Sequence, residues 1–132
     1  MTEPGKEVVE FSPIGYVENR FHDNVPSDVG STESKIQIAT DLREGLSGLE
    51  QGVEVLILFW CHRSQGFELL QHPRGDTNRP KRGVFTLRSP HRPNAIALTR
   101  VRVLDIEGCT LRVAGLDALD GTPVLDLKPA SS

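Results

Sequence analysis

Glycine and proline divide this chain into short apolar segments, and this punctuation constrains the fold more than any other feature of the sequence. The 132 residues include 12 glycines and 9 prolines, and the longest uninterrupted apolar run, Val55–Cys61, has seven members. Long helices need stretches free of Gly and Pro, whereas short apolar runs bounded by these residues are typical of strands and turns. The pattern therefore predicts an all-β protein with minor helices.

Seven segments are expected to form strands. The segment Val53–Cys61 is rich in β-branched and aromatic residues, which predicts a central strand buried on both faces. Glu107 and Gly108 predict a hairpin turn between two of the strands. About seven strands at this spacing predict a barrel or a sandwich. The other expected strands are Val8–Val17, Ile36–Ile38, Gly83–Leu87, Ala95–Ile106, Thr110–Leu116 and Val124–Leu127.

Polar segments between these strands predict two exposed loops and one brief helix. Residues 20–34 are polar and too long for a simple connector, which indicates a functional or mobile loop. Residues 75–82 predict a second loop, which is basic. Asp41–Glu44 has the spacing of a capping box and predicts a helix, which Gly45 and Gly48 keep short.

Length and composition favour a single domain, residues 1–132, with its core at about 10–129. No apolar run approaches the roughly 18 to 20 residues that span a bilayer. The polar N-terminal residues lack the apolar middle of a signal peptide. Two cysteines, Cys61 and Cys109, do not make a disulfide framework, so we expect no membrane association and a cytoplasmic location.

Charge is distributed unevenly along the chain, although the net charge is only −3. Residues 1–62 hold 4 Lys and Arg against 11 Asp and Glu, whereas residues 63–102 hold 9 against 2. A basic segment of this kind can attract an anionic partner locally. The alternative is that these arginines pair with acids of the first half across the fold.

The common cofactor and metal motifs are missing. Neither a Gly-x-Gly-x-x-Gly turn nor a phosphate-binding loop occurs, so a Rossmann fold is not expected. The histidines His62, His72 and His91 are ten and nineteen residues apart, which matches no common zinc pattern, and we predict no metal. A metal-dependent enzyme built on these three histidines remains the third alternative.

The segment Arg88–Asn94 is the strongest local candidate for a site. Its two prolines stiffen the backbone, so the side chains of Arg88, His91 and Arg92 project with little entropy left to lose. Arginine suits carboxylate and phosphate, and Asn94 can both donate and accept a hydrogen bond. The alternative is a structural corner whose arginines are merely solvated.

Two further features could line a pocket. Asp117 and Asp120 flank a tight turn that ends at Gly121; their carboxylates could bind ribose hydroxyls, or they could simply cap a turn with Gly121 at positive φ. His62 follows the apolar strand and either faces a pocket or lies on its rim. Cys61 is a weak candidate nucleophile, because burial raises a thiol pKa.

Several motifs together resemble the TsaA-like family, also called TrmO-like or YaeB-like. The resemblance covers about residues 10–129 and is most specific in two long blocks. The matching motifs are Ile14–Val17, Gly45–Glu50, Leu58–His62, Arg82–Pro90, Arg92–Asn94 and Leu119–Pro129.

The resemblance implies a small single-sheeted β-barrel that uses S-adenosylmethionine as cofactor and is commonly a homodimer. It implies methylation of N6 of threonylcarbamoyladenosine next to the anticodon of tRNA, with His91 or Asp117 as a possible base. The basic residues implied to hold RNA are Arg74, Arg79, Lys81, Arg82 and Arg92, with Asn94 beside them. The residues implied to line the cofactor cleft are Pro26, Ser27, Asp28, His62, Arg63, Arg88, Leu98, Leu116, Asp117, Ala118, Leu119 and Asp120.

Two alternatives to the tRNA methyltransferase stay open on the sequence. The basic segment 63–102 is compatible with a barrel that binds RNA without catalysis. A methyltransferase that acts on a small-molecule acceptor is the other alternative. With an aromatic content of 5%, stacking surfaces are few, so substrate recognition is expected to rely on shape and charge.

Overall fold

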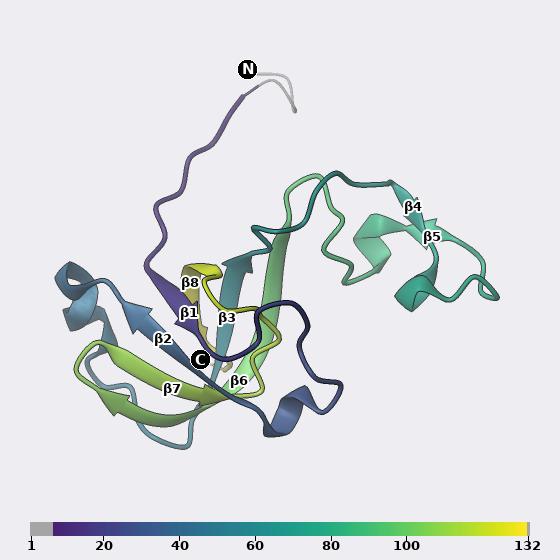
Figure 1. Cartoon of the computed structure of the whole chain (residues 1–132). Coiled ribbons are helices and arrows are strands. Elements are labelled where there is room, and N and C mark those ends of the chain that lie inside the picture. The colour runs from purple at the N-terminus through teal and green to yellow at the C-terminus, as the bar shows by residue number, and fades with distance from the viewer. Residues whose placement is uncertain (1–6, 132) are drawn as a thin grey trace.

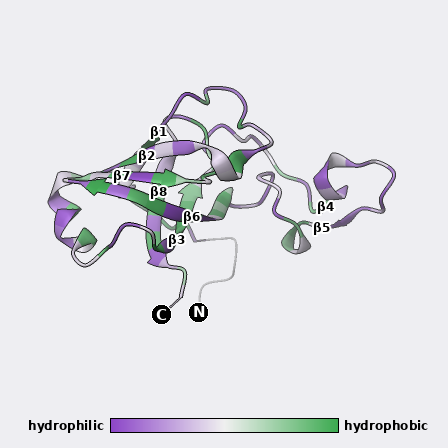
Figure 2. Ribbon diagram, turned by 90° about the horizontal axis from the view of Figure 1, so that it is seen from below, coloured by the Kyte–Doolittle hydropathy of each residue, from purple (hydrophilic) through white to green (hydrophobic). Residues whose placement is uncertain are grey.

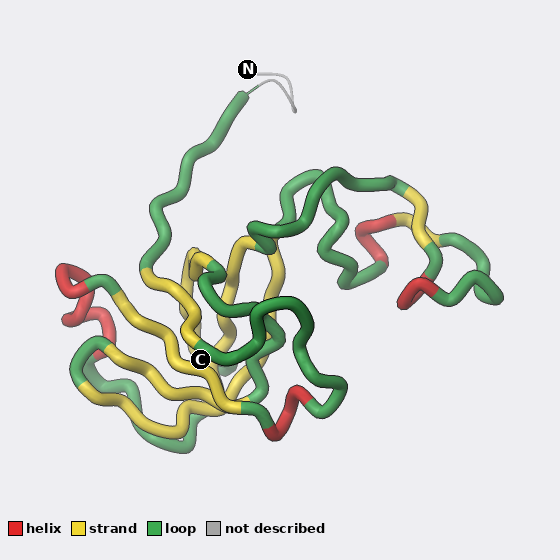
Figure 3. Tube along the Cα trace, in the orientation of Figure 1, coloured by secondary structure: helices red, strands yellow, loops and turns green. Residues whose placement is uncertain are grey.

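The structure, a computed structural model, describes residues 7–131 and is built mainly of strands (Figures 1 and 3). The strands are β1 (Gly15–Glu18), β2 (Glu33–Ile38), β3 (Glu54–Trp60), β4 (Leu70–Gln71), β5 (Arg82–Gly83), β6 (Ile96–Glu107), β7 (Thr110–Ala114) and β8 (Pro123–Pro129). Short 3-10 helices occur at η1 (Val29–Ser31), η2 (Thr40–Leu46), η3 (Pro73–Gly75) and η4 (Val84–Thr86).

Six of these strands form a closed antiparallel barrel in the order β1-β2-β7-β6-β3-β8. Closure satisfies the backbone of the edge strands that an open sheet would leave unpaired. The remaining strands, β4 and β5, form a separate two-stranded ribbon. They lie in residues 61–95, here called the arm, which extends away from the barrel (Figure 1). The prediction of a small barrel with minor helices is confirmed.

The barrel interior is filled by β-branched and aliphatic side chains. Alternate residues of each strand point inward, as in β2, where Ser34, Ile36 and Ile38 are buried and their neighbours are exposed. Ile36, Ile57 and Leu111 are fully buried. The ribbon coloured by hydropathy shows the same alternation along the barrel strands (Figure 2).

The strand β3 corrects one prediction. Its burial alternates between Val55, Ile57 and Phe59, which are buried, and Leu56 and Leu58, which are half-buried. A barrel wall has one interior face, so even a continuous apolar run is only half enclosed. The expected burial of Val53–Cys61 on both faces is therefore wrong, although the strand itself is present.

Other element boundaries also differ from those expected. Of the expected strand Val8–Val17, only residues 15–17 belong to β1, which continues to Glu18. In place of the strand Gly83–Leu87, two residues pair with β4 and the helix η4 follows. The expected capping box at Asp41–Glu44 is absent, because η2 begins after Ala39 without a side-chain cap. The hairpin turn after Glu107 is confirmed.

The strand β6 has twelve residues but two partners of unequal length. It pairs with β3 from Ile96 to Arg102, whereas its pairing with β7 begins only at Arg102. Gly115, at φ 92°, follows β7 where the chain turns away from β6. One side of β6 is consequently open over its first residues, at the end of the barrel that meets the arm.

No helix among residues 7–131 is long and apolar enough to cross a membrane.

Gly15 provides a test of barrel closure. A Cβ atom at this position would lie 2.3 Å from the Gln37 carbonyl oxygen, so Gly15→Ala forces β1 and β2 apart. We expect a loss of roughly 1 to 3 kcal/mol in the free energy of unfolding, measured by urea denaturation. Gly45→Ala is the control, because nothing lies within 4 Å of its Cβ position. Equal stability of both variants would contradict the close approach.

Candidate functional site

A cleft of about 1010 Å³ opens at the end of the barrel beside the arm. The ends of β3 and β6 provide its inner wall through Phe59, Ala97 and Thr99. Loop residues, including Val25 and Leu119, close it from the other sides. Its volume is at the upper end of the roughly 300–1,000 Å³ that small-molecule sites usually have.

The open side of β6 faces this cleft. Backbone hydrogen bonds join Ala95 O to Cys61 N at 2.8 Å and Val103 N to Val53 O at 2.9 Å, so the odd-numbered residues of β6 direct their backbone to β3. Leu98, an even-numbered residue that lines the cleft, directs its N–H and C=O to the other side. Because β7 reaches only as far as Arg102, the Leu98 backbone has no strand partner there among the described residues.

Arg88 and His91, on the returning segment of the arm, form one wall of the cleft. The Ser64 hydroxyl donates to the Pro90 carbonyl at 3.2 Å and lies 3.4 Å from Nδ1 of His91. With the hydroxyl proton directed to Pro90, Oγ accepts from Nδ1–H of His91, and this tautomer leaves Nε2 as an acceptor. Gln71 Nε2 donates to the His91 carbonyl at 2.6 Å and fixes the residue to the arm.

Asp117 and Cys61 both line the cleft, and the charge of Asp117 acts on the Cys61 thiol. Burial raises the pKa of the Cys61 thiol, and the Asp117 carboxylate raises it further. The thiol is therefore protonated at neutral pH and unsuited to be a nucleophile, as the sequence predicted. Asp117 remains exposed and available as an acceptor for hydroxyl or ammonium groups.

A hydrogen-bond network fixes the loop after β1 to the turn before β8. The side chain of Asn19 donates to Ser34 Oγ and to the Ala118 carbonyl, both at 2.9 Å. Asp120 Oδ1 accepts from the Asn19 backbone N–H at 2.9 Å. The predicted site residue Asp120 thus supports the cleft wall rather than lining it, and Gly121 has the expected positive φ of 81°.

Arg63 lines the cleft and contacts the loop that follows β1. Its guanidinium donates to the carbonyl of His22 and lies 3.4 Å from Asp23 Oδ1. Asp23 and Asn24 line the cleft beside it. Arg63 is therefore a link between the start of the arm and the loop 20–28.

The structure brings most of the expected cofactor residues together. Those that line the cleft are His62, Arg63, Arg88, Leu98, Asp117, Ala118 and Leu119, and the expected base His91 lines it as well.

Other expected residues lie beside the cleft. Leu116 is fully buried in the core. Pro26, Ser27 and Asp28 do not line it, although their neighbours Val25 and Val29 do.

The expected RNA-contacting residues divide into two groups. Arg74, Arg79, Lys81 and Arg82 line a second pocket on the arm. Arg92 lines the cleft, but its guanidinium donates to the Leu87 and Ser89 carbonyls at 2.7 and 3.3 Å, which stabilises the returning loop. Asn94 is exposed and lies outside both pockets. Its backbone carbonyl accepts a hydrogen bond from Ile96 N at 2.7 Å.

The sequence interpretation missed Asn19 and Ser64. The bonds that join Asn19 to Ala118 and Ser64 to Pro90 connect segments distant in sequence, so no local pattern predicts them. Asn24, Val25 and Thr99 were also missed as lining residues. The position of Thr99 could have been deduced from strand alternation with Val101.

Across residues 7–131, the side chains of His, Cys, Asp and Glu form no group of three that could hold a metal ion. The three histidines of the metal-dependent alternative do not form such a group in this part of the chain.

A closed six-stranded barrel with a cleft between one end and a basic arm defines a small β-barrel protein with a candidate ligand site. The sequence profile of the tRNA-methyltransferase O N-terminal domain matches residues 18–132. A probable S-adenosyl-L-methionine-binding protein of Methanothermobacter thermautotrophicus is 40% identical over 125 residues, which are 92% of this chain and 89% of that protein. The chain belongs to the family of tRNA-methyltransferase O N-terminal domains.

Longer relatives share the same region. The mouse tRNA (adenine(37)-N6)-methyltransferase is 39% identical over 129 residues, covering 89% of this chain but 30% of the mouse protein. The crystal structure of TrmO from Pseudomonas aeruginosa superposes with a TM-score of 0.74 at 34% identity, covering 93% of this chain and 56% of that one. The chain thus matches nearly the full archaeal protein and only part of the mouse and bacterial ones.

The effect of Asp117 on Cys61 can be measured directly. Asp117→Asn removes the charge that raises the thiol pKa, so more thiolate forms at a given pH and alkylation of Cys61 by iodoacetamide becomes faster. Peptide mass spectrometry follows Cys61 separately, with Cys109 in the same sample as the internal control. A Cys61 rate unchanged by the substitution would show that the two groups do not interact.

Proposed function

We propose that this protein is an S-adenosylmethionine-dependent methyltransferase that acts on N6 of threonylcarbamoyladenosine next to the anticodon of tRNA. The observation that carries the proposal is the unpaired Leu98 backbone in a cleft that also contains Arg88, His91 and Asp117. The family match supports it, as do relatives named S-adenosyl-L-methionine-binding proteins and tRNA (adenine(37)-N6)-methyltransferases.

The residues of the cleft fit each part of the cofactor. An adenine ring presents an adjacent donor and acceptor, which match the free C=O and N–H of Leu98 at the strand edge. Phe59 and Leu119 offer apolar surface for the ring. Asp117 can accept ribose hydroxyls, and Arg88 can pair with the carboxylate of the methionine part.

Methylation of N6 requires a base that takes up the proton that N6 loses. When bound, S-adenosylmethionine supplies a methyl group on a positively charged sulfur. Nε2 of His91 is free to accept the proton from N6 while Nδ1–H is held by Ser64. His91 would take up the N6 proton as that nitrogen receives the methyl group that the cofactor would supply. Most of the remaining acceleration comes from orientation, for which roughly 7 to 11 kcal/mol is accessible.

A homodimer in the cytoplasm is part of the proposal. Phe85, Leu69 and Leu70 on the arm are 78%, 61% and 58% exposed, which is the kind of apolar surface that a partner subunit covers. The two free thiols suit a reducing compartment. Sedimentation equilibrium should give twice the chain mass, and a monomer at tens of micromolar would contradict the dimer.

A methylation assay tests the function. Purified protein, S-adenosylmethionine and an anticodon stem-loop that carries threonylcarbamoyladenosine should yield an N6-methylated nucleoside by liquid chromatography and mass spectrometry. We expect His91→Gln to lower kcat by roughly 100- to 10,000-fold while cofactor affinity is kept. Lys35→Gln is the control, since Lys35 lies on the exposed face of β2 outside both pockets.

Three outcomes of this assay would redirect the proposal. RNA binding without any methylated product would favour the non-catalytic RNA-binding barrel. Methylation of small adenosine derivatives but not of RNA would favour a small-molecule acceptor. A kcat of His91→Gln equal to that of the wild type would exclude His91 as the base.

Arg88→Ala tests the position of the cofactor. We expect affinity for S-adenosylhomocysteine to fall by roughly 1.5 to 3 kcal/mol, the usual contribution of a hydrogen bond to a charged group. Isothermal titration calorimetry measures it, with Arg102→Ala on the barrel wall as a charge-matched control. Wild-type affinity in Arg88→Ala would mean that the carboxylate binds elsewhere.

A further inference from the structure

The arm has a second pocket that adjoins the cleft and shares Arg88 and His91 with it. It has a volume of about 1210 Å³ and contains residues from β4, β5 and the loops around them. Its charged side chains are one acid, Glu68, and five cations. The cations are Arg74, Arg79, Lys81, Arg82 and Arg88.

These cations lack acidic partners within the described residues. Some arginines elsewhere are paired: Arg63 lies 3.4 Å from Asp23, and Arg112 lies 3.1 Å from Glu33. No ion pair in residues 7–131 includes any of the five pocket cations. The alternative in which acids of the first half neutralise the basic segment therefore holds for Arg63 but fails for the five pocket cations, and a concentration of like charge remains that favours an anionic ligand.

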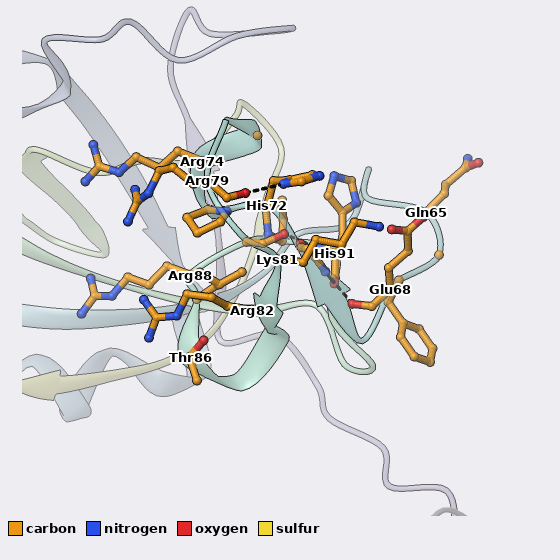
Figure 4. A pocket seen from close by; sticks show the side chains of 18 residues that line it. Gln65, Glu68, His72, Arg74, Arg79, Lys81, Arg82, Thr86, Arg88 and His91 are labelled. Atoms are coloured by element: carbon orange, nitrogen blue, oxygen red, sulfur yellow. Dashed lines mark hydrogen bonds between the residues drawn. The ribbon is translucent and has the colours of Figure 1, made fainter. Parts of the chain in front are cut away.

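The loop that presents the cations has fixed contacts. Nδ1–H of His72 donates to the Arg79 carbonyl at 2.8 Å, and Asp76 Oδ1 accepts from Asn78 N at 2.9 Å. Arg74 has a φ of 53° and is the only described residue other than glycine with a positive φ. In Figure 4 the guanidinium groups of Arg74, Arg79, Arg82 and Arg88 extend in the same direction.

An aromatic ring lines the same pocket. Phe67 is 51% exposed, and its ring is available for stacking. A cationic groove with an aromatic side chain is the usual arrangement for unpaired nucleotides, because phosphates bind the cations and bases stack on the ring. Paired RNA offers phosphates but no free base face.

The pocket also adjoins the reaction cleft. Arg88 and His91 line both cavities, so a ligand strand in the arm pocket can place its next base beside His91. Ser64 and Gln71 hydrogen-bond to the backbone of Pro90 and His91, which holds the arm and this wall together.

We propose that the arm pocket binds the sugar-phosphate backbone of the unpaired RNA nucleotides that flank the acceptor adenine. The inference rests on the proposed function for the identity of the acceptor. Phosphates contact Arg74, Arg79 and Lys81, and a neighbouring base stacks on Phe67.

The test compares two charge-matched double variants. Arg79→Ala/Lys81→Ala removes two pocket cations, and Arg43→Ala/Arg102→Ala removes two cations outside both pockets. Binding of a fluorescent RNA hairpin with the acceptor adenine in its loop is measured by anisotropy at several salt concentrations. Loss of two contacts to single-stranded phosphates should reduce the salt-dependence slope by about 1.4. The control variant should keep the wild-type slope and affinity.

Arg74→Gly separates binding from folding. Glycine adopts a positive φ without strain, so the unfolding temperature should not fall, while affinity for the hairpin loop should. Phe67→Leu should weaken hairpin binding by about tenfold and leave binding of a fully paired duplex unchanged. Equal loss in the Arg43/Arg102 control, or duplex binding as tight as hairpin binding, would overturn the proposal.

The outcome can be distinguished from failure of the proposed function. If Arg79→Ala/Lys81→Ala binds S-adenosylhomocysteine normally and methylates at saturating RNA with wild-type kcat, the arm acts in RNA binding alone, as proposed. If the wild type binds RNA through the arm but methylates nothing, the proposed function fails and this inference stands. If the wild type methylates and the arm variant binds RNA normally, only this inference fails.

Discussion

The unequal pairing of β6 is the constraint on which the site depends. All twelve residues of β6 are in extended conformation, yet β7 accompanies it only from Arg102 onward. In a closed barrel every backbone edge is normally satisfied, whereas the N–H and C=O of Leu98 lack a strand partner and can pair with water or a ligand. The barrel thus leaves the Leu98 backbone available at the place where the cleft opens.

The loops around that edge are held by bonds between distant segments. Asn19 connects the loop after β1 with the turn at Ala118, and Arg63 connects the start of the arm with His22. Such contacts reduce the entropy that ligand binding would otherwise have to offset. The cleft lies against the barrel, whereas the unpaired cations lie on the arm beyond Arg88 and His91. The proposed cofactor site and the proposed RNA site are therefore on different parts of the fold.

The sequence predicted the fold better than it predicted the geometry of the site. Short apolar segments between Gly and Pro identified the barrel strands, but the enclosure of β3 on one face only depends on barrel closure, which no local pattern records. Basic residues from 74 to 82 were recognised by charge, and they share one pocket. Asp120, Leu116 and Arg92 were grouped with the ligand-contacting residues. Asp120 instead bonds to the distant Asn19, Leu116 is buried in the core, and the Arg92 guanidinium donates to carbonyls of its own loop.

The most direct test of the account is the response of backbone amides to S-adenosylhomocysteine. Two-dimensional ¹H–¹⁵N NMR of the labelled protein should show the largest shift at the Leu98 N–H, with further shifts at Arg88 and Asp117. The amides of residues 72–82 should remain unchanged until RNA is added. Shifts concentrated in residues 72–82, with Leu98 unaffected at saturation, would contradict the assignment of the open edge of β6 as the cofactor site.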